Sequence, residues 1–293
     1  MNRRDFIAGA AMAGAAMTMT KGADSQTKST IKKAKLNISS QDGIIPGNSL
    51  EEKLEKMQKW GFQGIEFGGG GLGDRVKSIQ KAMANSPLKV SAICAGFSGA
   101  LISEQESERK KCIESCKVIL DAAGQIGSTG LIIVPAFNGQ TKLSNQEGRK
   151  ILIDLYPELG EYAKKCGTRM LLEPLNRGEC FFLRQLADGA SICRDSKNEG
   201  CCMMGDFYHM YIEETNDMGA FISAGSFLHH VHLASIKRNL PGQDERDYTD
   251  GFRGLKHIGY QDYCSFECGV IGNREEEIPK AVQFLRGQWA KAV

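Results

Sequence analysis

Leu131-Ile132-Ile133-Val134 is an uninterrupted apolar run near the middle of the chain. Successive residues of a strand point to opposite faces of its sheet, so a run with no polar residue indicates a strand buried on both faces. Such burial is typical of a parallel sheet covered by helices. The run belongs to a set of eight short β-prone stretches. They are Lys35–Ser39, Gly64–Gly68, Lys89–Ala95, Gly130–Ala136, Met170–Pro174, Cys201–Phe207, His230–Ala234 and Ser265–Val270.

Amphipathic helical stretches alternate with these strands. The first begins after Ser49 with a pattern typical of a capping box. The others are expected at Asp74–Met83, Glu104–Ile126, Asn145–Cys166, Leu183–Lys197, Glu213–Ala224, Asp250–Ile258 and Glu275–Ala292. Eight strand–helix units of about 33 residues each predict one α/β domain, a (β/α)8 TIM barrel over residues 34–293. A doubly wound open sheet is the competing fold, but no GxGxxG motif follows the first strand.

The composition is that of an ordinary globular protein. Of the 293 residues, 41% are hydrophobic and 25% are charged, which argues against disorder and coiled coil. The formal net charge of +2 gives no electrostatic reason to expect nucleic acid or an anionic membrane as a partner. The ten cysteines include no CxxC pair. We expect most of them to be small core residues, with one disulfide as the alternative.

The N-terminus has the pattern of an export signal. Arg3 and Arg4 precede a short apolar stretch rich in Ala and Gly, which resembles the twin-arginine type. The apolar run from Phe6 to Met19 is too short to span a bilayer well. We therefore expect a signal over residues 1–23, a flexible lead-in over residues 24–33 and an exported, periplasmic protein without stable membrane insertion. An ordinary amphipathic N-terminal helix is the alternative.

Four predicted strands carry a possible metal ligand where they end. These residues are Glu173, Asp206, His232 and Glu267, and they are separated by 33, 26 and 35 residues. Each separation is about one strand–helix unit, so the four side chains are expected to converge above the mouth of the barrel. Any one of them alone would more often be a salt-bridge partner or a core residue, and only the regular spacing makes them a candidate site.

Three carboxylates and one imidazole in one place would repel one another unless a divalent cation neutralised them. Oxygen-rich ligation with a single nitrogen suits Mn²⁺ best, with Mg²⁺, Co²⁺, Fe²⁺ or Zn²⁺ as alternatives. The set does not suit a structural zinc site, which prefers thiolates.

Several motifs at these positions resemble the xylose-isomerase-like barrel superfamily of sugar isomerases and epimerases, and within it the ketose 3-epimerase branch. The resemblance is based on the motifs Glu173-Pro174-Leu175-Asn176-Arg177-Gly178-Glu179, Asp206-Phe207-Tyr208-His209, Ile212-Glu213-Glu214, His232 with Arg238, and Glu267. The resemblance implies a metal-binding role for Glu173, His232 and Glu267, and a substrate-binding role for Glu179, His209 and Arg238. The residues before Arg238, Ala234-Ser235-Ile236-Lys237, differ from the usual Gly-Glu-x-Asn. The resemblance also allows a homodimer or a homotetramer.

The expected chemistry is proton transfer next to a sugar keto group. A metal that polarises the carbonyl makes the neighbouring C–H acidic, one carboxylate removes the proton to give a cis-enediolate, and the opposite carboxylate returns a proton. We assign Glu173 and Glu267 to this acid–base pair, while Arg238 could stabilise the developing oxyanion.

Several other functions compete with this one. Aldose–ketose isomerisation uses the same intermediate. A lyase, hydratase or epimerase acting on 3-keto-sugars or keto-glycosides in the envelope is a further alternative, and a non-catalytic sugar-binding protein is the alternative from another class. An endonuclease of the same superfamily is disfavoured. The resemblance implies that such an enzyme would have further metal-binding His residues at the ends of the third and fourth strands, but here these ends, Ile93–Gly96 and Val134–Ala136, carry no His.

Overall fold

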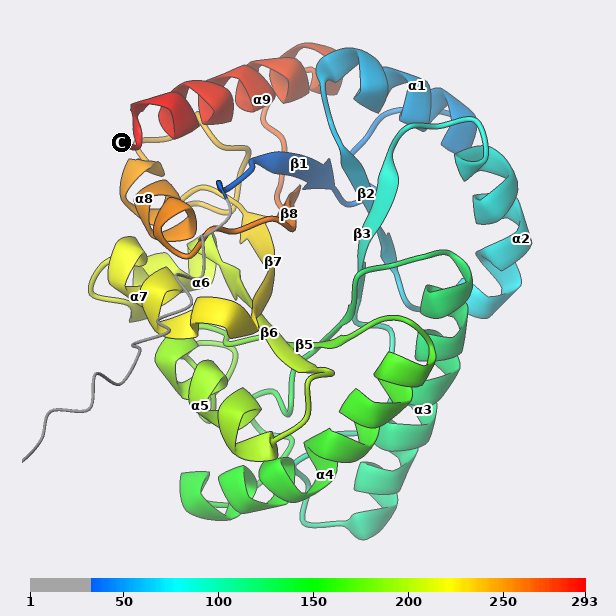
Figure 1. The fold of residues 1–293 in the computed structure, drawn as a ribbon, viewed down its shortest axis with the longest axis vertical. Helices are drawn as coiled ribbons and strands as arrows, with labels where there is room; N and C mark the ends of the chain where they lie inside the picture. The colour runs from blue at the N-terminus through cyan, green and yellow to red at the C-terminus, as the bar shows by residue number, and fades with distance from the viewer. Residues whose placement is uncertain (1–32) are drawn as a thin grey trace, which may run out of the picture. The chain divides into compact units, whose positions relative to one another are not determined.

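The computed structural model describes residues 33–293. The export signal predicted over residues 1–23 lies outside the described residues, as does the lead-in predicted over residues 24–33 except for its last residue. The described part is a nearly closed barrel of eight parallel strands in the order β1-β8-β7-β6-β5-β4-β3-β2, which confirms the predicted (β/α)8 fold (Figure 1). The strands are β1 (Asn37–Ser40), β2 (Gly64–Gly68), β3 (Lys89–Cys94), β4 (Leu131–Ile133), β5 (Met170–Leu172), β6 (Cys201–Asp206), β7 (Leu228–Leu233) and β8 (Tyr263–Phe266).

Helices surround this barrel on its outer side (Figure 1). They are α1 (Leu50–Trp60), α2 (Leu72–Met83), α3 (Glu106–Gln125), α4 (Asn145–Lys165), α5 (Leu186–Ser196), α6 (Phe207–Glu213), α7 (Asp217–Ala224), α8 (Thr249–His257) and α9 (Arg274–Lys291), with a 3-10 turn η1 (Gly225–Phe227) before β7. Helix α1 begins as predicted, because the Ser49 side chain accepts a hydrogen bond from the Glu52 N–H. Among residues 33–293, none of the helices combines the length and the apolar character that crossing a bilayer requires.

The prediction of a single helix over Glu213–Ala224 is wrong. The chain forms α6 and α7 instead, separated by three residues. Glu214 is extended, and the side chain of Asn216 accepts a hydrogen bond from Gly219 N–H at 2.7 Å, which begins a new helix. The early start of α6, directly after β6, places two turns of helix beside the mouth of the barrel.

Alternation along the strands divides the core into two parts. Most buried apolar side chains lie between the strands and the helices, as Met203 does against Gly189 of α5. A smaller cluster points to the barrel interior from β3 to β6 and consists of Ala92, Ile132, Leu171, Cys202 and Met204. Seven of the ten cysteines are buried, in agreement with a core role.

The barrel closes between β1 and β2 through a few contacts rather than a continuous ladder. Gln63 N–H donates to the Ile38 carbonyl at 2.8 Å, and Asp42 N–H donates to the Glu66 carbonyl at 2.9 Å. An isolated bridge pairs Gln41 with Glu66. Two of these contacts involve Gln41 and Asp42, which follow β1, so that part of the seam lies at the carboxyl ends of the strands, where functional side chains of a TIM barrel gather.

Glycines allow two loops to approach each other closely at this end of the barrel. Gly96, after β3, has φ +92°, and a Cβ there would lie 2.3 Å from Gly70 N. A Cβ at Gly69, after β2, would lie 2.1 Å from the Ala95 carbonyl oxygen. Only glycine fits this contact, because any side chain would overlap backbone atoms.

Candidate metal centre

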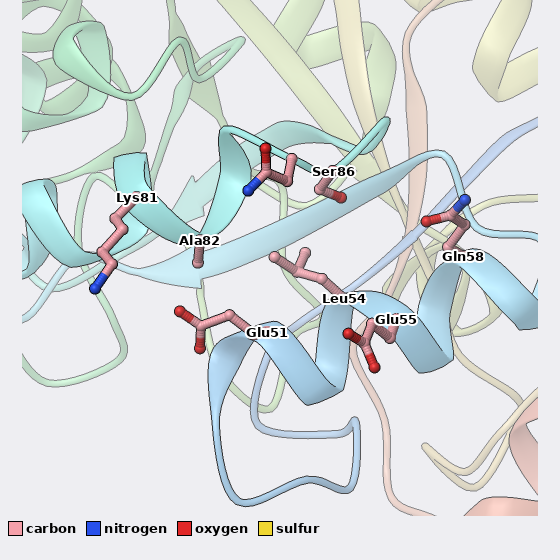
Figure 2. A pocket seen from close by; sticks show the side chains of 8 residues that line it. Glu51, Leu54, Glu55, Gln58, Lys81, Ala82 and Ser86 are labelled. Atoms are coloured by element: carbon pink, nitrogen blue, oxygen red, sulfur yellow. The ribbon is translucent and has the colours of Figure 1, made fainter.

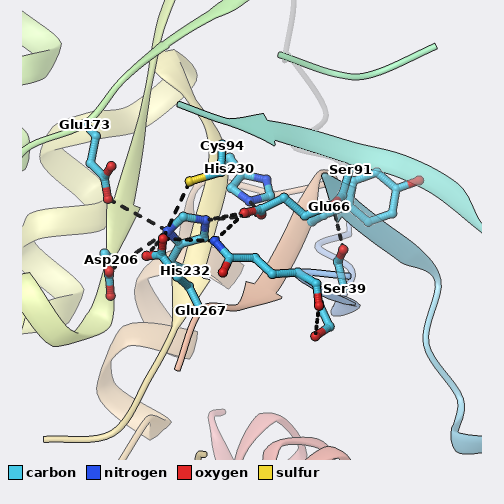
Figure 3. A network of polar contacts seen from close by, with 12 residues as sticks. Ser39, Glu66, Ser91, Cys94, Glu173, Asp206, His230, His232 and Glu267 are labelled. Carbon is cyan, nitrogen blue, oxygen red and sulfur yellow. Dashed lines mark hydrogen bonds and ion pairs between the residues drawn. The ribbon is translucent and has the colours of Figure 1, made fainter. Parts of the chain in front are cut away.

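The four residues predicted from spacing lie together at the carboxyl ends of four neighbouring strands (Figure 3). Glu173 directly follows β5, Asp206 ends β6, His232 lies in β7, and Glu267 directly follows β8. Each contributes one possible ligand atom, and these atoms all lie within 4.8 Å of one another. Asp206 and His232 are fully buried, so the cluster lies in the mouth of the barrel rather than on its surface.

The ring atom Nδ1 of His232 is the centre of this cluster. It lies 2.8 Å from Glu267 Oε2, 3.8 Å from Glu173 Oε1 and 4.0 Å from Asp206 Oδ2. The atom is buried and has no hydrogen-bond partner among the described residues, since none of these oxygens is aligned for one. A buried nitrogen without a partner, surrounded by carboxylate oxygens, fits a divalent cation.

Asp206 contributes to local structure as well as to the cluster. Its Oδ1 accepts a hydrogen bond from Tyr208 N–H at 2.8 Å and so caps the N-terminus of α6. Its Oδ2 faces the cluster and pairs with the Arg238 guanidinium. The cap fixes the carboxylate, so the other oxygen has a defined direction.

The three residues expected to bind substrate surround the four. His209, buried on α6, has Nε2 3.6 Å from Asp206 Oδ2. Its Nδ1 lies 3.9 Å from Oε1 of Glu179, which is nearly half exposed. Arg238, at φ +59°, donates to both Asp206 and Glu267, and its guanidinium stacks over the Tyr208 ring at 4.7 Å.

One residue that the sequence did not single out connects His209 to Glu179. The Asn176 side-chain amide donates to Glu179 Oε1 at 2.8 Å and approaches His209 Nδ1 at 2.8 Å, and the Asn176 backbone N–H donates to the same Nδ1 at 3.2 Å. Because Nδ1 accepts a backbone N–H, the neutral His209 ring carries its proton on Nε2, which faces the cluster.

A second group of buried polar side chains lies directly against the first and was missed from the sequence. Glu66 of β2 is fully buried, and its Oε2 lies 2.8 Å from His230 Nε2. Both Glu66 oxygens lie 3.1 Å from His232 Nε2 (Figure 3). Gln41 connects the two groups, because its amide donates to Glu66 Oε1 and to Glu267 Oε1, at 2.9 Å in each case.

One of two adjacent histidines in β7 faces the helices, and the other faces the barrel interior. His229 faces the helices, since it is half-buried and its Nδ1 lies 2.8 Å from Asp262 Oδ2. His230 is fully buried and shares the inner face of β7 with His232. Alternation along the strand carries this information, because residues two apart point the same way.

The carboxylates of the cluster have different proton affinities. Burial and the charge of Glu267 raise the pKa of Glu173 above its usual value, although His232 opposes this. Burial would also raise the pKa of Glu267, but the charges of His232 and Arg238 outweigh it and lower that pKa to about 2. Glu173 is therefore the carboxyl that holds a proton more readily, and Glu267 is the one that stays ionised.

A pocket lies away from this cluster, between α1 and α2 (Figure 2). Its lining includes Glu51, Glu55 and Lys81. None of its lining residues belongs to either group of possible metal ligands among residues 33–293. The barrel mouth is the better candidate for chemistry.

The described architecture agrees with known proteins along most of the chain. The family model of the xylose isomerase-like TIM barrel matches residues 54–288. The 3-dehydro-D-guloside 4-epimerase of Escherichia coli (strain K12) is 30% identical over 241 residues, which cover 79% of this chain and 92% of that protein.

Solved structures of other proteins have a similar fold. The apo crystal structure of 3-keto-D-glucoside 4-epimerase from E. coli matches with a TM-score of 0.80 and 27% identity, over 86% of this chain and all of that one. A D-psicose 3-epimerase, crystallised in the presence of D-fructose, matches with a TM-score of 0.78 over 87% of this chain and 99% of that one. At 18% identity, this second likeness concerns the fold alone.

Proposed function

The chain belongs to the xylose isomerase-like TIM barrel family, and from that premise we propose that it is a divalent-metal-dependent sugar epimerase. The observation that carries the proposal is the cluster of Glu173, Asp206, Glu267 and the unpartnered Nδ1 of His232. A protein that only bound sugar would not need two carboxylates, Glu173 and Glu267, that can remove and return a proton within such a cluster.

The cluster residues would hold one divalent cation. Glu173, Asp206, Glu267 and His232 Nδ1 supply three oxygens and one nitrogen, a set for which Mn²⁺ is our preferred ion. When bound, such a cation polarises the carbonyl of a keto-sugar, so that the neighbouring C–H becomes more acidic.

The chain's own carboxylates would then move the proton. Glu267 would remove the hydrogen from the carbon next to the keto group and leave a cis-enediolate. Glu173 would return a proton to the opposite face and invert the centre, and the roles would exchange in the reverse direction.

Three further residues would orient the sugar. His209 presents an Nε2–H to a substrate oxygen, because Asn176 occupies its Nδ1. Glu179, with one oxygen held by Asn176, accepts a hydroxyl, and Arg238 donates to the oxygen that gains charge.

The substrate class that we favour is the 3-keto-glycoside, with epimerisation at the neighbouring carbon. The support is the relative at 30% identity over most of both chains, which acts on a 3-dehydro-glycoside. Free ketoses and aldose–ketose isomerisation are the second choice, supported by the fold likeness to a D-psicose 3-epimerase. The twin-arginine-type pattern at residues 1–23 supports a periplasmic location, where oxidised glycosides would be met.

A substrate panel tests the proposal. The Mn²⁺-loaded protein is incubated with 3-keto-glycosides and with free ketohexoses, and the epimers are separated by carbohydrate chromatography. We expect epimer formation at the carbon next to the keto group of a 3-keto-glycoside, and a loss of about 10²- to 10⁴-fold in kcat for Glu267→Gln. Full turnover by Glu267→Gln would refute the assigned acid–base pair.

A further inference from the structure

Glu66 is a charged side chain without access to solvent, and the reaction proposed above does not use it. It lies on β2 and faces the barrel interior, directly beside His232 of the candidate metal-binding cluster. Three side chains satisfy it: His230 through Nε2 at 2.8 Å, His232 through Nε2 at 3.1 Å and Gln41 through its amide at 2.9 Å. Burying a carboxylate costs folding free energy unless hydrogen bonds compensate it. The presence of Glu66 inside the barrel therefore suggests a function for it.

The contacts of Glu66 determine where the protons of the two histidines lie. An ionised carboxylate only accepts hydrogen bonds, so each ring nitrogen that faces it carries a proton. Nε2 of His230 lies 2.8 Å from Glu66 Oε2, and Nε2 of His232 lies 3.1 Å from both Glu66 oxygens, so in each ring it is Nε2 that donates. His232 therefore has its proton on Nε2, and Nδ1 is the atom left to bind a cation.

We propose that Glu66 is a positioning residue for the metal centre, which fixes the tautomer and the ring orientation of His232 so that Nδ1 faces the three carboxylates. His230 and Gln41 hold Glu66 in place from β7 and from the end of β1. The proposal rests on the proposed function for the existence of the metal site, and it extends that site to β1 and β2. A carboxylate behind a metal-binding histidine typically contributes 10- to 100-fold to metal affinity.

A second metal site is the competing explanation of the same residues. Glu66, His230 and His232 also offer ligand atoms within 4.8 Å of one another. The separations of 2.8 to 3.1 Å are, however, ordinary hydrogen-bond lengths with a proton between the atoms. A second cation would also require His232 to lose both ring protons, because its two nitrogens would each bind an ion. We therefore expect one ion per chain.

Zinc binding and imidazole NMR test the proposal on the full chain. Zn²⁺ is the probe because it is diamagnetic, and its affinity is measured by competition with a chelator. We expect one Zn²⁺ per wild-type chain, with Nε2 of His232 protonated and Nδ1 bound to the metal in long-range ¹H–¹⁵N spectra. Glu66→Gln, which keeps the shape of the side chain, is expected to bind Zn²⁺ 10- to 100-fold more weakly and to lose the single His232 tautomer.

Two control comparisons separate this role from a general loss of packing. Asp217→Asn makes the same carboxylate-to-amide change at a buried residue that pairs with Arg246 and contacts neither group of possible metal ligands. It is expected to bind Zn²⁺ like wild type. His230→Gln should weaken Zn²⁺ binding, whereas the same substitution at His229, on the outer face of the strand, should not.

Three results would overturn the proposal. The first is wild-type Zn²⁺ affinity and an unchanged His232 spectrum in Glu66→Gln. The second is a wild-type spectrum in which Nδ1 of His232 is protonated and Nε2 binds the metal, a measurement that needs no variant. The third is two Zn²⁺ per wild-type chain, one of which is lost in Glu66→Gln. Absence of any divalent-ion binding by the wild type would instead remove the proposed function, and this proposal with it.

Discussion

Two substitutions of Asp206 separate the contributions that its carboxylate makes to the protein. Oδ1 caps α6 through Tyr208 N–H, and Oδ2 belongs to the candidate metal-binding cluster. Asn at this position can still cap a helix, whereas Ala cannot. Both substitutions remove the charge that faces Arg238 and His232. The difference in melting temperature between Asp206→Asn and Asp206→Ala therefore measures the contribution of the helix cap. The metal-dependent stabilisation that both variants lose measures the contribution of Asp206 as a metal ligand.

The structure gives a magnitude for each contribution. Loss of a helix cap costs typically about 1 kcal/mol, so without added metal Asp206→Ala is expected to melt about 2–4 °C below Asp206→Asn. A cation that binds only the folded wild type, at 100 times its Kd, adds about 2.7 kcal/mol and raises the melting temperature by about 5–11 °C. Neither variant should show this second increase, because each lacks one of the four ligands.

Calorimetric melting in EDTA and in Mn²⁺ measures both effects. The Asp217→Asn protein, whose substitution lies outside the cluster, serves as the control and should keep the full metal-dependent increase. An equal increase in Asp206→Asn and in wild type would show that Asp206 is not a ligand. Equal melting temperatures of the two Asp206 variants in EDTA would show that the cap contributes nothing.

Gly96→Ala is expected to destabilise the protein by about 3 kcal/mol or more in urea unfolding, because its Cβ would overlap backbone atoms. Gly127→Ala, with φ +69° and open space around it, should cost only about 1 kcal/mol, and equal costs would exclude the overlap. The hydrogen bond from Arg177 lowers the pKa of Glu213, so this carboxylate stabilises the fold above pH 4.5 and less as the pH falls through its folded value. Glu213→Gln should therefore have a lower urea midpoint than wild type at pH 7, and this deficit should shrink as the pH falls below 4.5, whereas a deficit that does not change with pH would contradict the assignment.

The barrel could be predicted from the sequence because its strands are short apolar runs at regular intervals. The prediction failed over Glu213–Ala224, where apolar periodicity continues through a break in the helix. The break depends on the Asn216 cap, a local hydrogen bond that periodicity does not register. The predicted strand ends are three residues too late at β4, two at β5 and four at β8, because the strands stop where their ladder bonds stop while the apolar sequence continues.

The cluster of four possible ligands could be predicted as well, because these residue types recur at one position in consecutive units. Glu66 could not, because one acidic residue in a strand carries no spacing signal of its own. His230 was within reach, since it lies two residues before His232 and therefore on the same face. Glu66 of β2 contacts His230 and His232 of β7 only because the barrel closes, and the sequence alone does not predict which side chains then meet in its interior.

Solvent deuterium incorporation tests the central claim most directly. The Mn²⁺-loaded protein is incubated in D₂O with a 3-keto-glycoside, and the recovered sugar is analysed by mass spectrometry, with Glu267→Gln as the comparison. We predict a mass increase of one deuterium at the carbon next to the keto group, in the wild type only. No deuterium in any 3-keto-glycoside or ketohexose, from protein shown to hold the metal, would contradict the account.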